Sequence, residues 1–271
     1  MVRSLWTAAS GMNAQQTNVD TIANNLANVN TTGYKAEVAE FKTLLYQTLQ
    51  TKTTTANGAN KPIGAQVGLG VRNSSIMSVF KQGAMLASES SSAFAIAGRG
   101  FFALRGEDGN TYYTRNGNFN FTIAQEGMML ANSDGLPVLD STGKPIVLGE
   151  QYVASKIGVD ADGNLTYPDD NNNAQPIGIK VGLYQFANSA GLEKVDSTMF
   201  LESAASGAAI NEATNNNVIK SQVHQGFLEG SSVQVADEMV NLIVAQRAYE
   251  MNSKAITTSD EMLQQANQLK R

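Results

Sequence analysis

The chain has 271 residues, enough for two average domains or for one domain with long extensions. Hydrophobic residues make up 42% of it and charged residues only 16%, against roughly 25% in an ordinary soluble protein. The net charge of −5 argues against a partner recognised through phosphates, the lack of cysteine excludes thiolate chemistry and disulfides, and a single histidine excludes any site that needs two.

The sequence shows neither a predicted membrane-spanning segment nor a predicted signal peptide. No run of about 18 apolar residues occurs, so no membrane-spanning segment is expected. The first six residues are followed by an amide-rich stretch and not by an apolar one, so we expect no secretory signal peptide. The protein should therefore stay in the cytoplasm, or leave it by a route that does not cleave the chain.

Residues 4–30 contain one charged residue, Asp20, and repeat apolar residues at every seventh position. The repeat predicts a heptad helix that ends near Thr32-Gly33. Its other faces carry amides instead of charges, which favours burial by neighbouring molecules. The apolar positions are Leu5, Met12, Val19 and Leu26, with a second row at Ala8, Ile22 and Val29; the amides include Asn24, Asn25 and Asn28.

The pattern returns between Val233 and Leu269 and predicts a second long helix, with Ser231 or Ser232 as its N-cap. The two helices most simply bury their apolar rows against each other, and further copies of the protein then have to cover the remaining faces. A helical hairpin buried within one monomer is the alternative. The apolar row consists of Val235, Met239, Leu242, Tyr249, Ile256 and Leu263.

Between the helices, turn dipeptides recur every 8 to 10 residues and predict an all-β region. We expect strands over 111–114, 119–122 and 179–186, and a hairpin around Asp162-Gly163. Residues 51–61 and 203–217 are predicted to be loops or connections. The recurring dipeptides are Asp108-Gly109, Asn116-Gly117, Glu126-Gly127, Asp134-Gly135 and Thr142-Gly143.

The sequence therefore predicts an α+β protein. Its terminal heptad helices pair as a coiled-coil domain, and an all-β domain is inserted between them. We expect the helical domain at 1–35 and 230–271, a connecting region at 36–70 and 203–229, and the β-domain at 71–202.

The candidate chemical motifs each have a simpler structural interpretation. His224 has no partner placed by the sequence, and Asp160-Ala-Asp162-Gly-Asn164 lacks the spacing of a calcium loop and suits a hairpin turn. The glycines of Gly98–Phe102 suit a bulge or close strand packing better than a phosphate loop. We therefore expect no enzyme, cofactor or metal, and an enzyme built on the β-domain or a monomeric adhesin-like module are the competing hypotheses.

Two terminal motifs resemble the axial proteins of the bacterial flagellum, the rod and hook family. They are Ile22–Lys35 (IANNLANVNTTGYK) and Gln246–Ile256 (QRAYEMNSKAI), the latter followed by Asp260–Leu263. The family-motif residues carried over are Asn24, Asn25, Asn28, Gly33, Tyr34, Gln246, Arg247 and Glu250. The resemblance continues through the internal motifs Gly100–Phe102, Tyr113–Gly117, Gly191–Glu193 and Gly226–Ser232. Within the family, Leu44–Leu49 and Gln66–Val71 resemble distal rod subunits; a proximal rod or other axial component is the alternative.

The resemblance implies a structural subunit that polymerises into a hollow helical tube, transmits motor torque to the hook and conducts exported subunits. It implies self-association through the apolar helix rows. It also implies contacts with proximal rod and hook proteins, P- and L-ring bushing proteins and the flagellar type III export apparatus, with no nucleic acid and no membrane insertion. The expected location is the periplasmic rod of the basal body, reached without a cleaved signal peptide.

Overall fold

The computed structural model describes residues 2–50, 64–124, 127–149, 151–169, 173–215 and 217–269. The chain forms two compact units, and the predicted loop at 51–61 lies outside the described residues. What we call the helical unit consists of Met1–Ala27, Glu37–Ser78 and Gln234–Arg271, and the β unit consists of Asn28–Ala36 and Val79–Val233.

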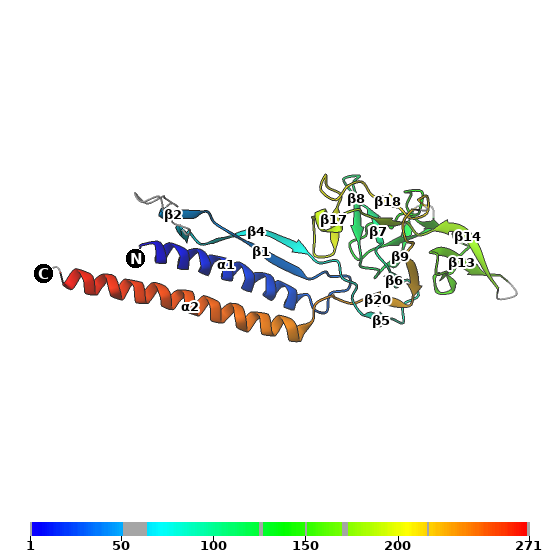
Figure 1. Ribbon diagram of the computed structural model, residues 1–271. Helices are drawn as coiled ribbons and strands as arrows, with labels where there is room; N and C mark the ends of the chain where they lie inside the picture. The colour runs from blue at the N-terminus through cyan, green and yellow to red at the C-terminus, as the bar shows by residue number, and fades with distance from the viewer. Residues whose placement is uncertain are drawn as a thin grey trace. The chain divides into compact units, whose positions relative to one another are not determined.

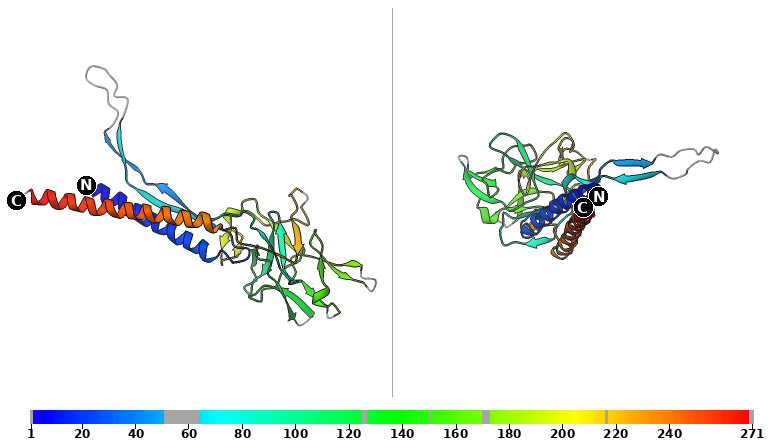
Figure 2. Two further views of the ribbon diagram at one scale, coloured as in Figure 1. Left: turned by 90° about the horizontal axis from the view of Figure 1, so that it is seen from below. Right: turned by 90° about the vertical axis from the view of Figure 1, so that its left-hand side faces the viewer.

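The helical unit is built on two antiparallel helices, α1 (Val2–Ala27) and α2 (Val235–Gln268), which lie side by side (Figures 1 and 2). Near one end of the pair the hydroxyl oxygens of Ser4 and Ser259 are 3.3 Å apart. Near the other end, the Asn25 amide donates to Glu238 Oε1 at 3.0 Å. The predicted pairing of the terminal helices, and with it the α+β class, is confirmed.

Two antiparallel ribbons complete the helical unit. β1 (Glu37–Thr43) pairs with β4 (Val71–Ser78), with a bulge between Glu40 and Phe41, and β2 (Tyr46–Gln50) pairs with β3 (Ala65–Gly68). The β1–β4 ribbon is tied to α1, because the Asn73 amide donates to Thr17 Oγ1 at 2.5 Å. One side of α1 is therefore covered by α2 and another by strands.

The predicted end of the first helix and the predicted start of the second helix were both wrong. α1 ends at Ala27, because residues 33–35 belong to the β unit, where Tyr34 and Lys35 are buried. Gly33 does adopt a positive φ of +72°, but its N–H donates to the Glu229 carbonyl at 2.7 Å and caps no helix. At α2 the N-cap is Gln234 without a side-chain bond, since Ser232 Oγ accepts instead from the Ala36 N–H.

The β unit contains a six-stranded sheet, two three-stranded sheets and two strand pairs among its described residues. The six-stranded sheet has the order β16 (Glu193–Lys194), β17 (Met199–Leu201), β8 (Thr111–Thr114), β7 (Phe101–Arg105), β15 (Leu183–Gln185), β18 (Ile210–Asn211). The three-stranded sheets are β11 (Val147–Leu148), β10 (Gly127–Ala131), β9 (Asn120–Ala124) and β12 (Gly158–Val159), β13 (Asn164–Pro168), β14 (Ala174–Lys180). The pairs are β19 (Gln222–Gln225) with β6 (Phe94–Ala97), and β20 (Phe227–Glu229) with β5 (Met85–Ala87). Two 3-10 turns occupy Ala154–Lys156 and Ser189–Gly191.

Most of the strand predictions are confirmed. β8 covers 111–114 as expected, the Asp108-Gly109 turn joins it to β7, and β12 and β13 form the hairpin around Asp162-Gly163. The turn dipeptide Asn116-Gly117 lies between β8 and β9, which belong to different sheets. One strand prediction was wrong. The expected strand over 179–186 is interrupted at Gly182, where the chain passes from β14 to β15 and so from one sheet to another.

The strand β7 lies at the centre of the β unit and is buried on both faces. Alternate residues of a strand point to opposite faces, so Phe102 and Leu104 enter one hydrophobic cluster while Phe101 and Ala103 enter another. In the first cluster the Phe102 ring meets Phe119 edge to face, with centroids 5.1 Å apart. The unbroken apolar run of this strand reflects its burial on both faces.

The buried rings of β7 should dominate the stability of the β unit. We expect Phe102→Ala to lower the free energy of unfolding by about 3–5 kcal/mol, because the substitution removes a fully buried ring and leaves a cavity. The matched control is Phe227→Ala on β20, a phenylalanine that is exposed. Denaturant unfolding followed by circular dichroism measures both, and equal losses in the two variants would contradict this account.

Candidate assembly surface and a buried ion cluster

Small and polar residues bring α1 and α2 together. A Cβ on Gly11 would lie 2.9 Å from the Asn252 amide nitrogen, so Gly11 lies directly against the Asn252 side chain, which a larger residue would have to displace. Six buried or half-buried residues of α2 lie on one side of the helix, and three of them, Glu238, Asn252 and Ser259, contact α1. We call these six the α1-facing row: Glu238, Leu242, Ala245, Asn252, Ile256 and Ser259. Ala8, Ala14 and Thr21 are buried on α1. The predicted apolar rows include Ala8, Leu242 and Ile256 of this set but not its polar members Glu238, Asn252 and Ser259.

Asn25 fixes three segments of the helical unit with one side chain. Its amide nitrogen donates to the Glu37 carbonyl at 2.8 Å and to Glu238 Oε1 at 3.0 Å, and its amide oxygen accepts from the Glu37 N–H at 2.8 Å. The neighbouring Asn24 donates to the Glu37 carboxylate at 3.1 Å. Because Asn25 is 1% exposed, these bonds form away from water, where leaving a polar group unpaired is costly.

The residues predicted to form the assembly rows differ in their surroundings. Ile22 is buried, and Leu5, Met12, Val19, Leu26, Leu242, Ile256 and Leu263 are half-buried. Val235, Met239 and Tyr249 are exposed, and Val29 lies beyond the end of α1 in the β unit. Of the family-motif residues, Asn25, Gly33 and Tyr34 are buried and Asn28 is half-buried, whereas Asn24, Gln246, Arg247 and Glu250 are exposed. The role of these residues in polymerisation stays a prediction.

The helical unit exposes many large apolar side chains. On α1, Trp6 is 72% exposed. Exposed apolar surface of this extent is typical of interaction sites, because a solvated helix normally presents polar residues there. The exposed residues on α2 are Val235, Met239, Val240, Ile243, Val244, Tyr249, Met251, Met262 and Leu269.

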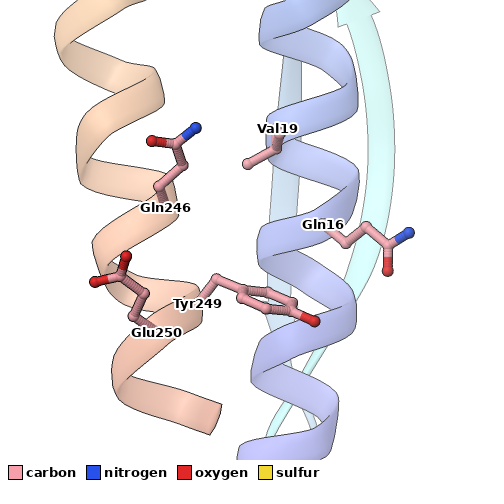
Figure 3. Close-up of a pocket in the computed structure, with 5 residues that line it drawn as sticks. All are labelled: Gln16, Val19, Gln246, Tyr249 and Glu250. Atoms are coloured by element: carbon pink, nitrogen blue, oxygen red, sulfur yellow. The ribbon is translucent and has the colours of Figure 1, made fainter. Parts of the chain in front are cut away.

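A surface groove of about 390 Å³ runs between α1 and α2, and we call it the flank groove. Figure 3 shows the Tyr249 ring reaching from α2 across to α1, with Val19 pointing toward α2. Gln16, Gln246 and Glu250 complete the lining. Glu250 also pairs with Arg247 at 2.9 Å, and both side chains of that pair remain largely exposed.

The β unit contains a buried cluster of three charged residues. Glu229 Oε1 lies 2.6 Å from Lys35 Nζ, and Glu229 Oε2 lies 3.2 Å from Arg115 Nη1. The Gly83 N–H also donates to Glu229 at 2.9 Å. Both cations also donate to main-chain carbonyls: Lys35 Nζ donates to the Lys81 carbonyl, and Arg115 Nη2 donates to the Gly98 carbonyl.

The cluster keeps its cations in an apolar setting. Burial lowers the pKa of Lys35 and of Arg115, and the Glu229 carboxylate opposes both shifts. The Arg115 guanidinium also lies over the Phe101 ring, 5.2 Å from its centroid. The attraction between these three charges and the hydrogen bonds they make offset the free-energy cost of removing them from water. Sequence reasoning did not connect these residues, although each lies in one of the motifs that carry the resemblance.

The motifs considered for chemistry have structural roles. The His224 ring lies edge-on to Phe227 at 6.5 Å, and the Asp160 carboxylate accepts from the Ala161 N–H within the β12–β13 hairpin. The Gly100 N–H donates to Ser221 Oγ at 2.9 Å, in the glycine segment between β6 and β7. Among the residues that the structure describes, no group of three His, Asp or Glu side chains is placed to hold a metal ion, and neither α1 nor α2 has the length and apolarity needed to cross a bilayer.

Comparison with known proteins covers both units. The chain matches the family models described as "Flagella basal body rod protein" over residues 5–35, "Flagellar hook protein FlgE/F/G D1 domain" over 95–167 and "Flagellar basal body rod FlgEFG protein C-terminal" over 224–269. It is 44% identical over 273 residues to the flagellar basal-body rod protein FlgG of Borreliella burgdorferi, with all of both chains covered. The chain belongs to the FlgG family of flagellar basal-body rod proteins.

Other FlgG proteins are similar over the same length. That of Buchnera aphidicola subsp. Schizaphis graminum is 40% identical, covering 99% of this chain and 100% of its own, and that of Bacillus subtilis is 38% identical with full coverage of both. FlgG-family membership makes this chain a structural subunit of the distal rod, in a family that is not enzymatic. It also places the chain in the basal-body rod, in assembly with other rod or hook components.

Removing the central charge of the cluster should destabilise the β unit of this FlgG-family chain. We expect Glu229→Gln to cost about 3–5 kcal/mol in the free energy of unfolding, because it leaves Lys35 and Arg115 buried without a counter-charge. Denaturant unfolding of the full chain gives the value. The control is Glu89→Gln, an exposed carboxylate of the same unit, and a loss no larger than the control's would contradict the role assigned to the cluster.

Proposed function

We propose that this chain polymerises through α1 and α2 into a hollow helical tube that transmits motor torque to the hook and conducts exported subunits. The observation that carries the proposal is the apolar surface that α2 exposes after it has packed on α1. One antiparallel pair cannot cover that surface, so further copies have to do so. A heterologous contact that does not close on itself generates a helical assembly.

The composition supports a mechanical role. A subunit that transmits torque needs many contacts with its neighbours and no reacting group, and only 16% of the residues are charged. Amide side chains such as Asn24, Gln16 and Gln246 lie on exposed parts of the helices. Amides can pair with amides when identical subunits stack, whereas repeated like charges repel one another.

The route and the partners follow from the same proposal. The chain leaves the cytoplasm uncleaved through the flagellar type III export apparatus and assembles in the periplasm. Its contacts there are other copies of itself, proximal rod proteins, the hook protein, and the P- and L-ring bushing proteins. The amphipathic pattern of the terminal helices supports this proposal, because isolated amphipathic helices fray in water and a frayed end suits passage through a narrow channel.

Charge placed in the helix rows should abolish assembly without unfolding the β unit. We expect Leu26→Asp and Leu242→Asp each to prevent polymerisation and motility, because a carboxylate in a half-buried apolar position costs several kcal/mol unless it is paired. Sedimentation and electron microscopy measure the polymer, motility is scored in cells, and near-UV circular dichroism follows the β unit.

Ile219→Asp is the matched control, since Ile219 is an exposed apolar residue of the β unit. It should assemble like the unmodified protein. A motile strain that carries Leu26→Asp together with Leu242→Asp would refute the assignment of these rows.

A further inference from the structure

The helix α2 presents three distinct faces. Successive residues of an α-helix are about 100° apart, so Val240, Val244, Met251 and Met262 fall within about 40° of one another and about 125° from the α1-facing row. We call these four residues the outer seam. Three residues of α2 line the flank groove: Tyr249 lies near the α1-facing row, and Gln246 and Glu250 lie about 110° from that row, on the side opposite to the outer seam.

The outer seam has the character of a packing surface without a partner. Its residues follow one another at spacings of 4, 7 and 11, the repeat of a helix that packs along a second helix. They are nevertheless between 47% and 66% exposed. α2 therefore carries a row of mixed small, polar and apolar residues that faces α1, and a separate apolar row that nothing in the described part of the chain covers.

The flank groove offers a complementary surface. Val19 and the Tyr249 ring provide its apolar lining, and Gln16, Gln246 and Glu250 provide polar groups (Figure 3). Met251 and Met262 are flexible, unbranched side chains of the kind that adapts to an irregular groove. A row of apolar side chains from another helix fits this combination better than a polar ligand does.

Arg247 and Glu250 place opposite charges beside the two surfaces. Arg247 lies between Val244 and Met251 in the sequence and about 50° from the seam's centre, while Glu250 lines the groove. Within one chain these two side chains pair at 2.9 Å, yet they are 73% and 63% exposed. Such an exposed pair contributes little, about 0–1 kcal/mol, so each partner is free to bind the same groups on a neighbouring molecule.

We propose that the outer seam of one subunit inserts into the flank groove of a second copy of this chain, with Arg247 of the first subunit pairing with Glu250 of the second. This inference rests on the proposed function and names the surfaces that carry it. The two surfaces differ and lie on different sides of α2, so every subunit offers one of each. The contact is heterologous and repeats from copy to copy.

Charge reversal tests the pairing in the full-length protein. Arg247→Glu alone sets Glu against Glu at every contact, and Glu250→Arg alone sets Arg against Arg. We expect each variant to raise the critical concentration for polymerisation at least about tenfold, measured by sedimentation, because like charges then meet across the interface. Thermal unfolding should be unchanged, since both residues are exposed, and Glu89→Arg on the β unit is the control.

An equal mixture of the two variants distinguishes contacts between subunits from contacts within one. In the mixture, the carboxylate introduced by Arg247→Glu in one variant meets the guanidinium introduced by Glu250→Arg in the other. The native Arg247 of the second variant likewise meets the native Glu250 of the first. We expect the mixture to assemble at the critical concentration of the unmodified protein. Assembly of either single variant at that concentration, or failure of the mixture, would overturn the proposal. If the unmodified chain forms no polymer, the proposed function itself fails.

Cross-linking gives a second, independent measurement, because the chain contains no cysteine. Gln16→Cys on the groove and Met251→Cys on the seam, combined in one chain, should form a ladder of dimers, trimers and larger species when polymers are oxidised. Each cysteine alone should give no species beyond a dimer. Polymers of the double variant that yield no ladder would place the contact elsewhere while leaving polymerisation established.

Discussion

The buried carboxylate of Glu229 joins two segments of the β unit that are far apart in the sequence. Lys35 belongs to the short segment that follows α1, and Glu229 to the segment that precedes α2, and their 2.6 Å contact ties these two segments together. The Gly33 N–H reinforces it by donating to the Glu229 carbonyl, and the Ser232 N–H donates to the Tyr34 carbonyl. These contacts bring together two segments of the β unit whose residues Lys35 and Glu229 are 194 positions apart in the chain.

Polar atoms, and not only apolar burial, determine how the helical unit is built. Asn25 bonds to both α2 and β1, and hydroxyls along α1 donate to carbonyls one turn earlier, as Thr21 does to Thr17 at 2.8 Å. These groups are satisfied inside the unit and require no water. With Gly11 against Asn252, they permit a close approach of the helices that two rows of leucine would prevent. The large apolar residues that this leaves uncovered lie on the outside of α2.

Structural features that depend on a local sequence pattern were predicted correctly, and features that depend on contacts between distant residues were not. The pairing of the terminal helices and strands such as β8 followed from spacing alone. The end of α1 did not, because Gly33 is required by the close approach of residues 115 and 116 and not by a helix C-terminus. The N-cap serines were misjudged because Ser232 bonds to Ala36. The ion cluster was missed because its members are up to 194 residues apart in the chain.

The two units differ in what they expose: α2 of the helical unit exposes large apolar side chains, whereas the β unit buries the charged side chain of Glu229. The β unit pairs the buried charges of Lys35, Arg115 and Glu229 and packs its aromatic rings in two hydrophobic clusters of its own. The helical unit leaves apolar residues at heptad spacing in water, a cost that only association removes. A subunit of this kind keeps its stability in one unit and its drive to assemble in the other, so a substitution in the outer seam can change the polymer without changing the fold of the β unit.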